Sequence, residues 1–366
     1  MNPLACYVHI PFCRSKCPYC DFYALRAGAD KQRLYAESAA RQLRGAAQAG
    51  RRWSTVYVGG GTPSALELAD LDLILSAIVN GRARKSEEMT VECNPGDVTA
   101  ALCALLAARG VNRVSLGLQS AVEAERRALG RRSGADQLRR AVEFLRAAGI
   151  ENISLDVMLG VPGQTEESMQ RTLAFCEEVG AEHISAYLLK LEPGTRFAQK
   201  PPPGLPDEDA QCELYLAACA WLEGHGYAQY EVSNFCRPGM ESRHNLVYWN
   251  AEPYYAVGPG AHGFTGGRRW RRERDLEGFL RGEGPVDDGP GGDFAEYALL
   301  RLRLTQGLRE DLVLRRFGHG IPQAVYDAAK PFTARGLARV GPEGAALTRE
   351  GFLLSNRLIA ALLENV

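Results

Sequence analysis

The strongest constraint on the fold of this 366-residue chain is an alternation of strand-like and helix-like segments from residue 5 to residue 190. Short apolar runs are each followed by a longer segment with apolar residues at helical spacing, and several of these longer segments end in glycine. Six such repeats imply a parallel sheet with crossover helices. The predicted strands are residues 5–10, 54–60, 89–93, 113–118, 153–159 and 183–190, and the predicted helices are residues 31–48, 65–79, 99–109, 136–148 and 166–179.

Unusual polar residues accompany the carboxyl ends of all six predicted strands. Cysteines follow the first strand, a glycine-rich turn follows the second, and Glu92, Gln119 and Asp156 mark the next three. In a β/α barrel these ends converge on one mouth, whereas a doubly wound sheet concentrates its site at a single switch point. The distribution therefore favours an α/β fold with an incomplete (β/α)6 barrel.

A second region follows the proline- and acid-rich segment 199–209, which interrupts the alternation. We expect a barrel domain over residues 1–205 and a smaller α+β domain over residues 206–366. The segments predicted within the smaller domain are a helix (208–225), a stretch rich in glycine, tyrosine and proline (244–267), a loop (281–292), and a strand–turn–helix tail (346–365) typical of a winged-helix-like module.

Composition and the N-terminal sequence indicate the compartment in which the chain works and the partners it does not bind. A net charge of -1 gives no reason to expect nucleic-acid binding. No apolar run approaches the roughly 18–20 residues of a membrane span. The N-terminus also lacks the regions of a signal peptide. We therefore expect a cytoplasmic protein, in which clustered cysteines more often bind metal or perform redox chemistry than form disulfides.

Three of the ten cysteines, Cys13, Cys17 and Cys20, form the pattern C-x3-C-x2-C directly after the first strand. Three thiolates can bind three irons of a [4Fe–4S] cubane, which ordinarily takes four cysteine ligands, and leave the fourth iron open to a small molecule. A structural zinc site is an alternative, with Cys6 or His9 as a fourth ligand, although both belong to the preceding strand. A redox pair within CPYC is another, but it leaves Cys13 unexplained.

The sequence GGGTP, residues 59–63, ends the second predicted strand. Glycines let the backbone approach a ligand closely and present its N–H groups. Alone, the segment is better explained as a simple tight turn. Beside a cysteine loop on the neighbouring strand, it indicates a site that holds a charged small ligand.

Several segments, in this order and spacing, resemble the radical S-adenosylmethionine (SAM) superfamily: YVHIPFCRSKCPYCDF, GGGTP, VECNP, LGLQS, LGR and LDVMLGVPGQT. More narrowly, the chain resembles the branch that contains oxygen-independent coproporphyrinogen III dehydrogenase and the HemW-type haem chaperones. RHNLVYWNAEPYYAVGPGAHGF (243–264) looks specifically HemW-like, so the similarity covers nearly the whole chain. The resemblance implies that Cys13, Cys17 and Cys20 bind a [4Fe–4S] cluster, and that the amine and carboxylate of SAM chelate its open iron.

The resemblance also implies ligand contacts. Tyr7, Gly60 and Glu92 match positions that contact the SAM on the cluster, and Tyr19 contributes from inside the cysteine loop. A further group matches positions that hold a second SAM in the dehydrogenase: Gly61, Thr62, Gln119, Arg131 and Asp156. For Gln119 and Asp156, capping of backbone groups is the structural alternative.

The candidate haem ligand is His244, in the segment H-N-x-x-Y-W. Imidazole is a strong axial ligand for haem iron, and Tyr248 and Trp249 offer apolar faces to a macrocycle. The alternative is a buried structural histidine, and His262 is a weaker second candidate. The basic run RRWRRER (268–274) is either a solvated strand face or a clamp for haem propionates or an acidic partner.

Two departures argue against the dehydrogenase. Phe22 stands where its cysteine loop continues to a further cysteine, and its N-terminal extension is longer than the residues that precede Cys13 here. These differences favour a monomeric or homodimeric haem chaperone that carries a [4Fe–4S] cluster and SAM. It would deliver haem to apoproteins such as membrane-bound respiratory enzymes, with flavodoxin as a suitable electron donor. The alternatives are a porphyrinogen dehydrogenase or other radical SAM enzyme, and a zinc-stabilised interaction protein.

Overall fold

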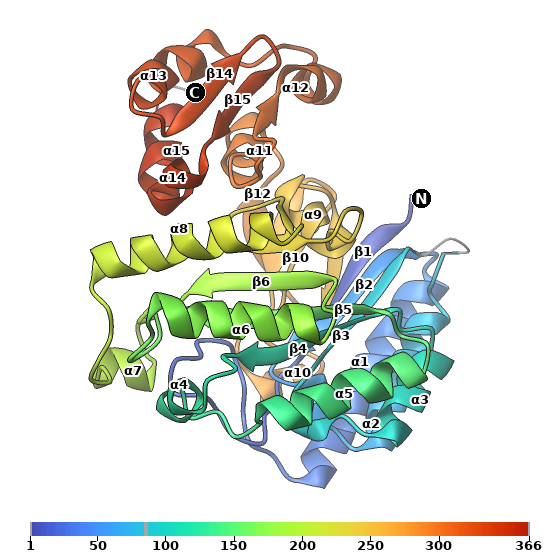
Figure 1. Ribbon diagram of the computed structural model, residues 1–366. Helices are drawn as coiled ribbons and strands as arrows, with labels where there is room; N and C mark the ends of the chain where they lie inside the picture. Colours follow the sequence, from blue (N-terminus) through green and yellow to red (C-terminus); the bar gives the residue numbers. More distant parts are fainter. Residues whose placement is uncertain (1, 84–86, 365–366) are drawn as a thin grey trace.

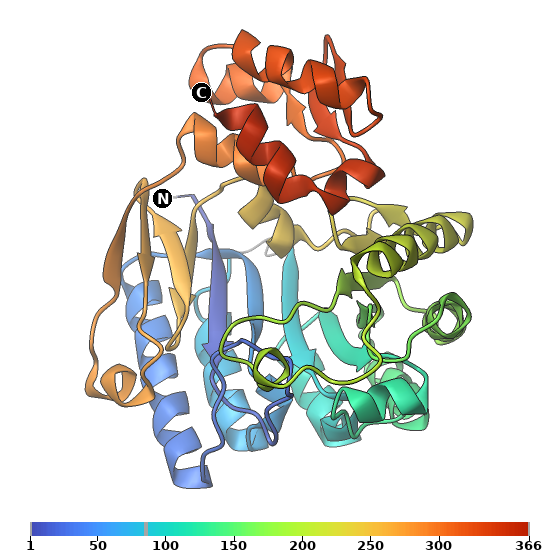
Figure 2. The same ribbon diagram turned by 90° about the vertical axis from the view of Figure 1, so that its left-hand side faces the viewer.

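The six predicted strands form one curved parallel sheet in the computed structural model, which describes residues 2–83 and 87–364 (Figure 1 and Figure 2). Each strand pairs in parallel with the next along the chain, so the predicted incomplete barrel is confirmed. The strands are β1 (Leu4–Ile10), β2 (Trp53–Gly60), β3 (Glu88–Cys93), β4 (Arg113–Gln119), β5 (Asn152–Leu159) and β6 (His183–Leu188).

Helices cover the outer face of this sheet (Figure 1). Val8, Val56 and Val91 point towards them and are fully buried, and burial of each such side chain stabilises the fold by about 1.5–3 kcal/mol. Gly110, Gly149 and Gly180 have positive φ just beyond three of the helices, as expected for glycine at helix ends. The helices are α1 (Ala29–Gln48), α2 (Leu68–Val79), α3 (Ala100–Ala108), α4 (Glu123–Ala128), α5 (Ala135–Ala147) and α6 (Glu166–Glu178), with short 3-10 turns at Pro63–Ala65 and Pro95–Asp97.

Residues after 205 extend the same sheet at both edges. At one edge, a short antiparallel pair of strands is added beside β6. At the other edge, one strand lies parallel to β1, and an antiparallel hairpin and a further strand follow it. The sheet in the described residues has twelve strands. The added strands are β7 (Ala228–Gln229), β8 (Asn234–Cys236), β9 (Tyr254–Val257), β10 (His262–Thr265), β11 (Arg268–Arg271) and β12 (Val286–Pro290).

Strand β12 corrects the prediction of a loop over 281–292. It pairs antiparallel with β11, and its Asp287 and Asp288 form ion pairs with Arg268 and Arg271. Glycine, proline and adjacent acids locally favour a turn. The strand forms because its partner supplies both backbone hydrogen bonds and opposite charges, which the local sequence does not reveal.

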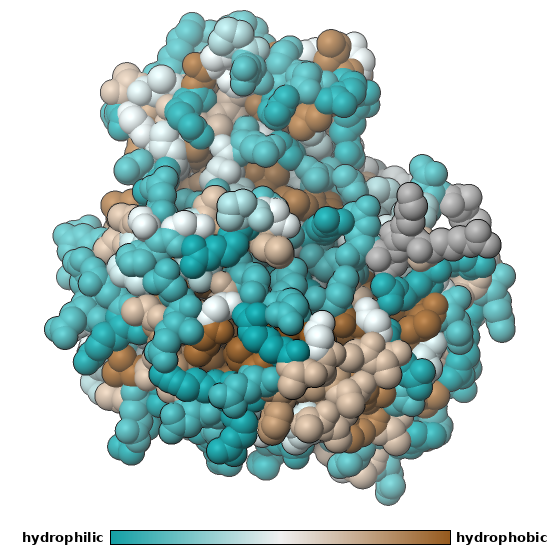
Figure 3. All heavy atoms as spheres, turned by 45° about the vertical axis from the view of Figure 1, so that its right-hand side comes forward, coloured by the Kyte–Doolittle hydropathy of each residue, from teal (hydrophilic) through white to brown (hydrophobic). Residues whose placement is uncertain are grey.

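Residues 293–364, here called the C-terminal module, form a separate lobe with a mostly hydrophilic surface (Figure 3). The lobe contains a three-stranded antiparallel sheet, and the predicted strand–turn–helix tail is present as β15, α14 and α15. No helix in the described part of the chain is both long and apolar enough to cross a membrane. The remaining elements of the chain are α7 (Arg196–Gln199), α8 (Glu208–Gly224), α9 (Arg243–Trp249), α10 (Leu276–Arg281), α11 (Phe294–Arg301), β13 (Leu308–Arg309), α12 (Glu310–Phe317), α13 (Gln323–Thr333), β14 (Ala338–Gly341), β15 (Gly344–Leu347), α14 (Arg349–Leu353) and α15 (Ser355–Leu363).

Candidate functional site

The cysteine loop lies at the mouth of the barrel, where the carboxyl ends of β1 to β6 meet. Cys13, Cys17 and Cys20 are free, half-buried thiols. Burial raises the pKa of Cys13, and the neighbouring Cys20 and Cys17 raise it further, so the three sulfurs lie within electrostatic reach of one another. The Cys13 Sγ is 3.4 Å from Thr62 Oγ1, and Arg131 Nη1 is 3.6 Å from the Cys17 Sγ. The cysteine loop, the GGGTP turn and the LGR segment therefore meet at one place.

The thiols fit a [4Fe–4S] cluster. In residues 2–83 and 87–364, no three histidine, cysteine, aspartate or glutamate side chains converge so as to hold a single metal ion. The cysteines of a cubane each bind a different iron and need not converge on one point. Thr62 and Arg131 add hydrogen-bond donors beside the sulfurs, and such bonds tune an iron–sulfur cluster.

The two alternative zinc ligands are engaged elsewhere. Cys6 is fully buried among the helices on the outer face of the sheet. His9 faces the inside of the barrel, where its Nδ1 is 2.9 Å from the Tyr7 hydroxyl and its Nε2 is 2.9 Å from the Tyr23 carbonyl oxygen. Tyr7, a predicted SAM contact, thus lies inside the barrel.

The GGGTP turn holds Glu92 against the backbone. The Gly60 N–H donates to Glu92 Oε2 over 3.1 Å, and the Tyr57 hydroxyl donates to Glu92 Oε1 over 2.7 Å. A Cβ on Gly59 would lie 2.7 Å from this carboxylate, so the approach requires glycine. Burial raises the pKa of Glu92 to about 7, and the nearby Asp156 adds to the rise. A carboxyl group in this state ionises readily when a cationic ligand binds beside it.

Asp156 and Gln119 lie on neighbouring strands at the mouth. Burial raises the pKa of Asp156 to about 6, although the Ser115 hydroxyl donates to it over 3.1 Å. Gln119 has a φ of 67° at an irregularity in the pairing of β4 and β5, and its Oε1 accepts from the Tyr187 hydroxyl over 2.8 Å. Such backbone conformations are rare for residues other than glycine and concentrate at functional sites.

Arg131 links several of these groups. Its Nη2 donates to the Gly117 carbonyl oxygen over 2.6 Å and to Asn94 Oδ1 over 3.0 Å, while its Nη1 faces Cys17. A Cβ on Gly117 would lie 2.8 Å from the guanidinium. Arg131 therefore keeps a fixed position between the cysteine loop and the end of β4.

A cavity of about 1010 Å³ runs from the cysteine loop past β6 to α14 and α15 of the C-terminal module. Tyr19 and Cys20 line it at the mouth, and Glu92 and Asp156 line it inside the barrel. Carboxyl groups of raised pKa that face a large cavity are typical of ligand sites. We refer to this space as the mouth cavity.

Helix α9, which carries the H-N-x-x-Y-W segment, closes the opposite end of the barrel, here called the floor. The Glu88 carboxylate accepts from Ser242 Oγ over 3.3 Å and from the backbone N–H groups of Arg243 and His244 over 2.9 and 3.0 Å. A carboxylate at a helix N-terminus is stabilised by these otherwise unpaired N–H groups. Glu88 thus fixes α9 across the floor.

His244 is fully buried in this floor. Its Nδ1 is 2.9 Å from Thr55 Oγ1, and its Nε2 is 2.8 Å from the Tyr248 hydroxyl. Burial lowers its pKa to about 3, so the imidazole is neutral. This geometry matches the structural alternative, and the haem-ligand role stays a prediction that requires α9 to leave the floor. His262, by contrast, is exposed on β10.

The basic run 268–274 begins as β11. Arg268 and Arg271 pair with the two aspartates of β12, and Arg269 pairs with Glu296 of α11. Exposed ion pairs of this kind contribute at most about 1 kcal/mol. The run is therefore largely neutralised by its neighbours.

Sequence reasoning missed two tyrosines of the site. Tyr57 donates to Glu92 and Tyr187 donates to Gln119. The signal was the two-residue period of a strand, because Tyr57 lies on the same face as Gly59 and opposite to the buried Val56 and Val58.

Comparison with known proteins agrees with this arrangement. The sequence profile of the radical SAM superfamily matches residues 7–176, from β1 to α6. The solved structure of coproporphyrinogen III oxidase (HemN) from Escherichia coli aligns with 100% of this chain and 91% of its own, with a TM-score of 0.85 and 20% identity. The fold and the cysteine loop thus define a radical SAM protein.

Relatives of similar length narrow the class. The heme chaperone HemW of Bacillus subtilis is 33% identical over 98% of both chains. That of Escherichia coli is 35% identical over 88% of this chain and 91% of the relative. The chain belongs to the HemW-type heme chaperone family of the radical SAM superfamily.

Proposed function

We propose that this protein binds a [4Fe–4S] cluster through Cys13, Cys17 and Cys20, binds SAM beside it, and binds haem that it passes to haem-dependent apoproteins. The observation that carries the cluster and SAM sites is the meeting of three free thiols, a glycine turn and two carboxyl groups of raised pKa at one mouth. Haem transfer is supported by the names of relatives that match nearly the full chain.

The groups at the mouth are complementary to SAM. The Glu92 and Asp156 carboxylates would pair with its amine and ribose hydroxyls, and Arg131 with its carboxylate. The remaining predicted contacts surround these three: Tyr7, Tyr19, Gly60, Gly61, Thr62 and Gln119. When bound, the cluster would supply an electron to SAM, and the role of these residues is to fix SAM in place and shield it from water.

The proposal includes a cytoplasmic location, a flavodoxin-type electron donor, and a monomer or homodimer. The oligomeric state is checked by size-exclusion chromatography with and without the cluster.

Anaerobic reconstitution followed by titration tests the cofactors in one sample. We expect about four irons and four acid-labile sulfides per chain, a SAM-induced change in the spectrum of the reduced cluster, and a saturable haem Soret band. Haem should then appear in an added apo-haemoprotein. Absence of sulfide would overturn the cluster, and turnover of coproporphyrinogen with dithionite and SAM would overturn a function restricted to haem transfer.

A further inference from the structure

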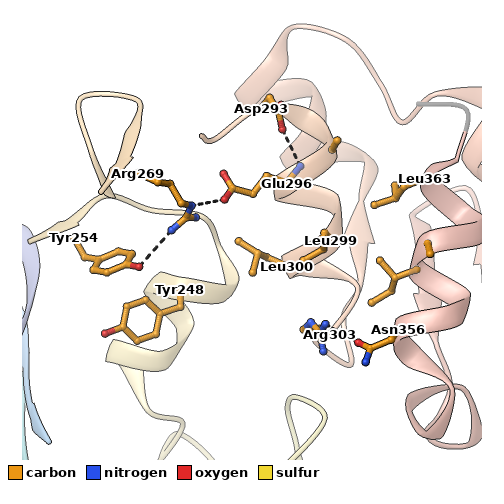
Figure 4. Close-up of a pocket in the computed structure, with 13 residues that line it drawn as sticks. Tyr248, Tyr254, Arg269, Asp293, Glu296, Leu299, Leu300, Arg303, Asn356 and Leu363 are labelled. Atoms are coloured by element: carbon orange, nitrogen blue, oxygen red, sulfur yellow. Dashed lines mark hydrogen bonds and ion pairs between the residues drawn. The ribbon is translucent and has the colours of Figure 1, made fainter. Parts of the chain in front are cut away.

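We propose that the haem macrocycle binds in a second cavity, of about 710 Å³, between α9, strands β9 and β11 of the large sheet, and helices α11 and α15 of the C-terminal module (Figure 4). This inference rests on the proposed haem-binding function and adds the position and the protein partners of the haem. We call this space the module cavity.

The walls of the module cavity are apolar and partly aromatic. They come from three helices and one strand of the large sheet: Leu299 and Leu300 of α11, Ile359 and Leu363 of α15, and the rings of Tyr248 of α9 and Tyr254 of β9. The two tyrosine rings meet edge to face with centroids 4.7 Å apart. Figure 4 shows the tyrosines on one side of the space and the aliphatic side chains on the other. A flat apolar macrocycle can pack between such walls.

Arg303 supplies the charge that a haem propionate requires. Its Nη2 donates to the neutral Asn356 Oδ1 over 2.9 Å, and it forms no ion pair within the described part of the chain. Arg269, the other arginine of the cavity, is already paired with Glu296 and also contacts the Tyr254 hydroxyl. A guanidinium without a carboxylate partner can form the paired hydrogen bonds that a propionate accepts.

The two cavities differ in their acidic lining. Four carboxyl groups (Asp21, Glu92, Asp156 and Glu192) and three basic side chains (Lys190, Arg303 and Arg357) line the mouth cavity, and Glu92 and Asp156 inside the barrel favour the cationic groups of SAM. The acids of the module cavity are already engaged, because Asp293 accepts from the Glu296 N–H over 2.8 Å and Glu296 pairs with Arg269. Arg303 and Asn356 line both cavities, so the haem would lie beside the SAM space but outside it.

The H-N-x-x-Y-W segment reaches this cavity through Tyr248. The ring of Tyr248 lines the cavity, whereas its hydroxyl points away from α11 and α15 and lies 2.8 Å from His244 Nε2 (Figure 4). His244 is then a positioning residue that fixes the Tyr248 ring from behind.

Haem titration of the reconstituted, full-length protein tests the site with two matched pairs. Leu299 and Leu314 are both exposed leucines of the C-terminal module (41% and 54%), and only Leu299 lines the cavity. Leu299→Glu should weaken haem binding at least tenfold and Leu314→Glu should leave it unchanged. Arg303→Glu should likewise weaken it at least tenfold, whereas Arg339→Glu, the same charge change outside the cavity, should not.

Cluster content should stay at wild-type levels in all four variants, and SAM binding should stay at wild-type levels in Leu299→Glu, Leu314→Glu and Arg339→Glu, which lie outside the mouth cavity. Wild-type haem affinity in both Leu299→Glu and Arg303→Glu would place the haem elsewhere and overturn the site, while leaving the proposed function intact. A wild-type protein that binds no haem would overturn the function and the site together.

Tyr248 variants separate the ring, which would pack against the haem, from the hydrogen bond through which His244 positions it. Tyr248→Phe keeps the ring and loses the hydrogen bond, so haem affinity should fall by up to about threefold, whereas Tyr248→Ala should lower it at least tenfold. Equal losses in the two variants would show that the hydroxyl, and not the ring, contacts the haem.

Discussion

The mouth and the floor of the barrel each contain a buried glutamate from the same strand, and the two are used in opposite ways. Glu88 at the start of β3 accepts hydrogen bonds from Ser242 Oγ and two N–H groups of α9. Glu92 at the end of β3 has two donors, and burial raises its pKa to about 7. Glu88 is thus committed to holding α9, whereas Glu92 remains available to a ligand.

The largest expected effect belongs to the mouth. Cys17→Ala should reduce the iron and sulfide of the reconstituted protein from about four each to nearly none, because two thiols do not retain a cubane. The melting temperature of the apoprotein should change by less than about 3 °C, since a half-buried loop thiol contributes little to stability. The matched control is Cys212→Ala, a half-buried thiol on α8; a similar loss of iron there would contradict the assignment.

At the floor, Glu88→Ala should destabilise the protein by about 4 kcal/mol, because Ser242 Oγ, Thr90 Oγ1 and the N–H groups of Arg243 and His244 lose their acceptor. The neighbouring Glu87 provides the control: it is exposed and forms an exposed ion pair with Arg243, so Glu87→Ala should cost less than about 1 kcal/mol. Urea unfolding measures both. Equal costs would mean that Glu88 does not hold the floor together.

Glu92, the buried carboxyl group at the mouth, should destabilise the apoprotein when it is ionised, whereas Glu88 stabilises it. The unfolded chain releases the Glu92 proton near its ordinary pKa of 4.5, whereas the folded protein keeps it to about pH 7. Stability of the apoprotein should therefore fall as pH rises from 4.5 to 7. Glu92→Gln should remove this component and stabilise the apoprotein at pH 8 by up to about 3 kcal/mol, while weakening SAM binding. Unfolding curves of the wild type and the variant at pH 4.5 and pH 8 test this prediction. A Glu92→Gln variant that is less stable than the wild type at pH 8 would contradict it.

The smallest expected effect is that of a substitution at His244, which tests whether its imidazole binds the haem iron. His244→Gln should cost about 2 kcal/mol, because Thr55 and Tyr248 lose a buried partner. The Soret band of bound haem should keep its position if the imidazole does not touch the iron. A shifted band at unchanged stability would instead support direct ligation.

The parallel core was predictable because its signals are local. Apolar strands, amphipathic helices and terminal glycines such as Gly110 and Gly149 all follow from spacing along the chain. Strand β12 was not predictable, since its formation depends on the β11 arginines 17 and 19 residues earlier, which a local reading of glycine, proline and aspartate does not include. The domain boundary at residue 205 stays a prediction, and the residues beyond it supply both sheet edges.

The same contrast holds for the site. The three cysteines and the GGGTP turn are recognisable from short spacings, and the structure brings them together with Arg131. The sequence does not distinguish Glu88 from its exposed neighbour Glu87, because only the fold brings the start of α9 against it. His244 belongs to a recognisable motif, but the motif does not reveal that the side chain is buried. One of its hydrogen bonds is to Thr55 on β2, which is distant in the sequence.

The bond between Glu88 and α9 joins residues 156 positions apart. A ribosome makes the six central strands long before it reaches residue 242, and chains generally begin to fold while they are being translated. The nascent barrel therefore stays open at its amino end, with an unsatisfied acid inside, until α9 emerges. Truncated chains that stop before this point should be degraded, which couples survival of the protein to translation past α9.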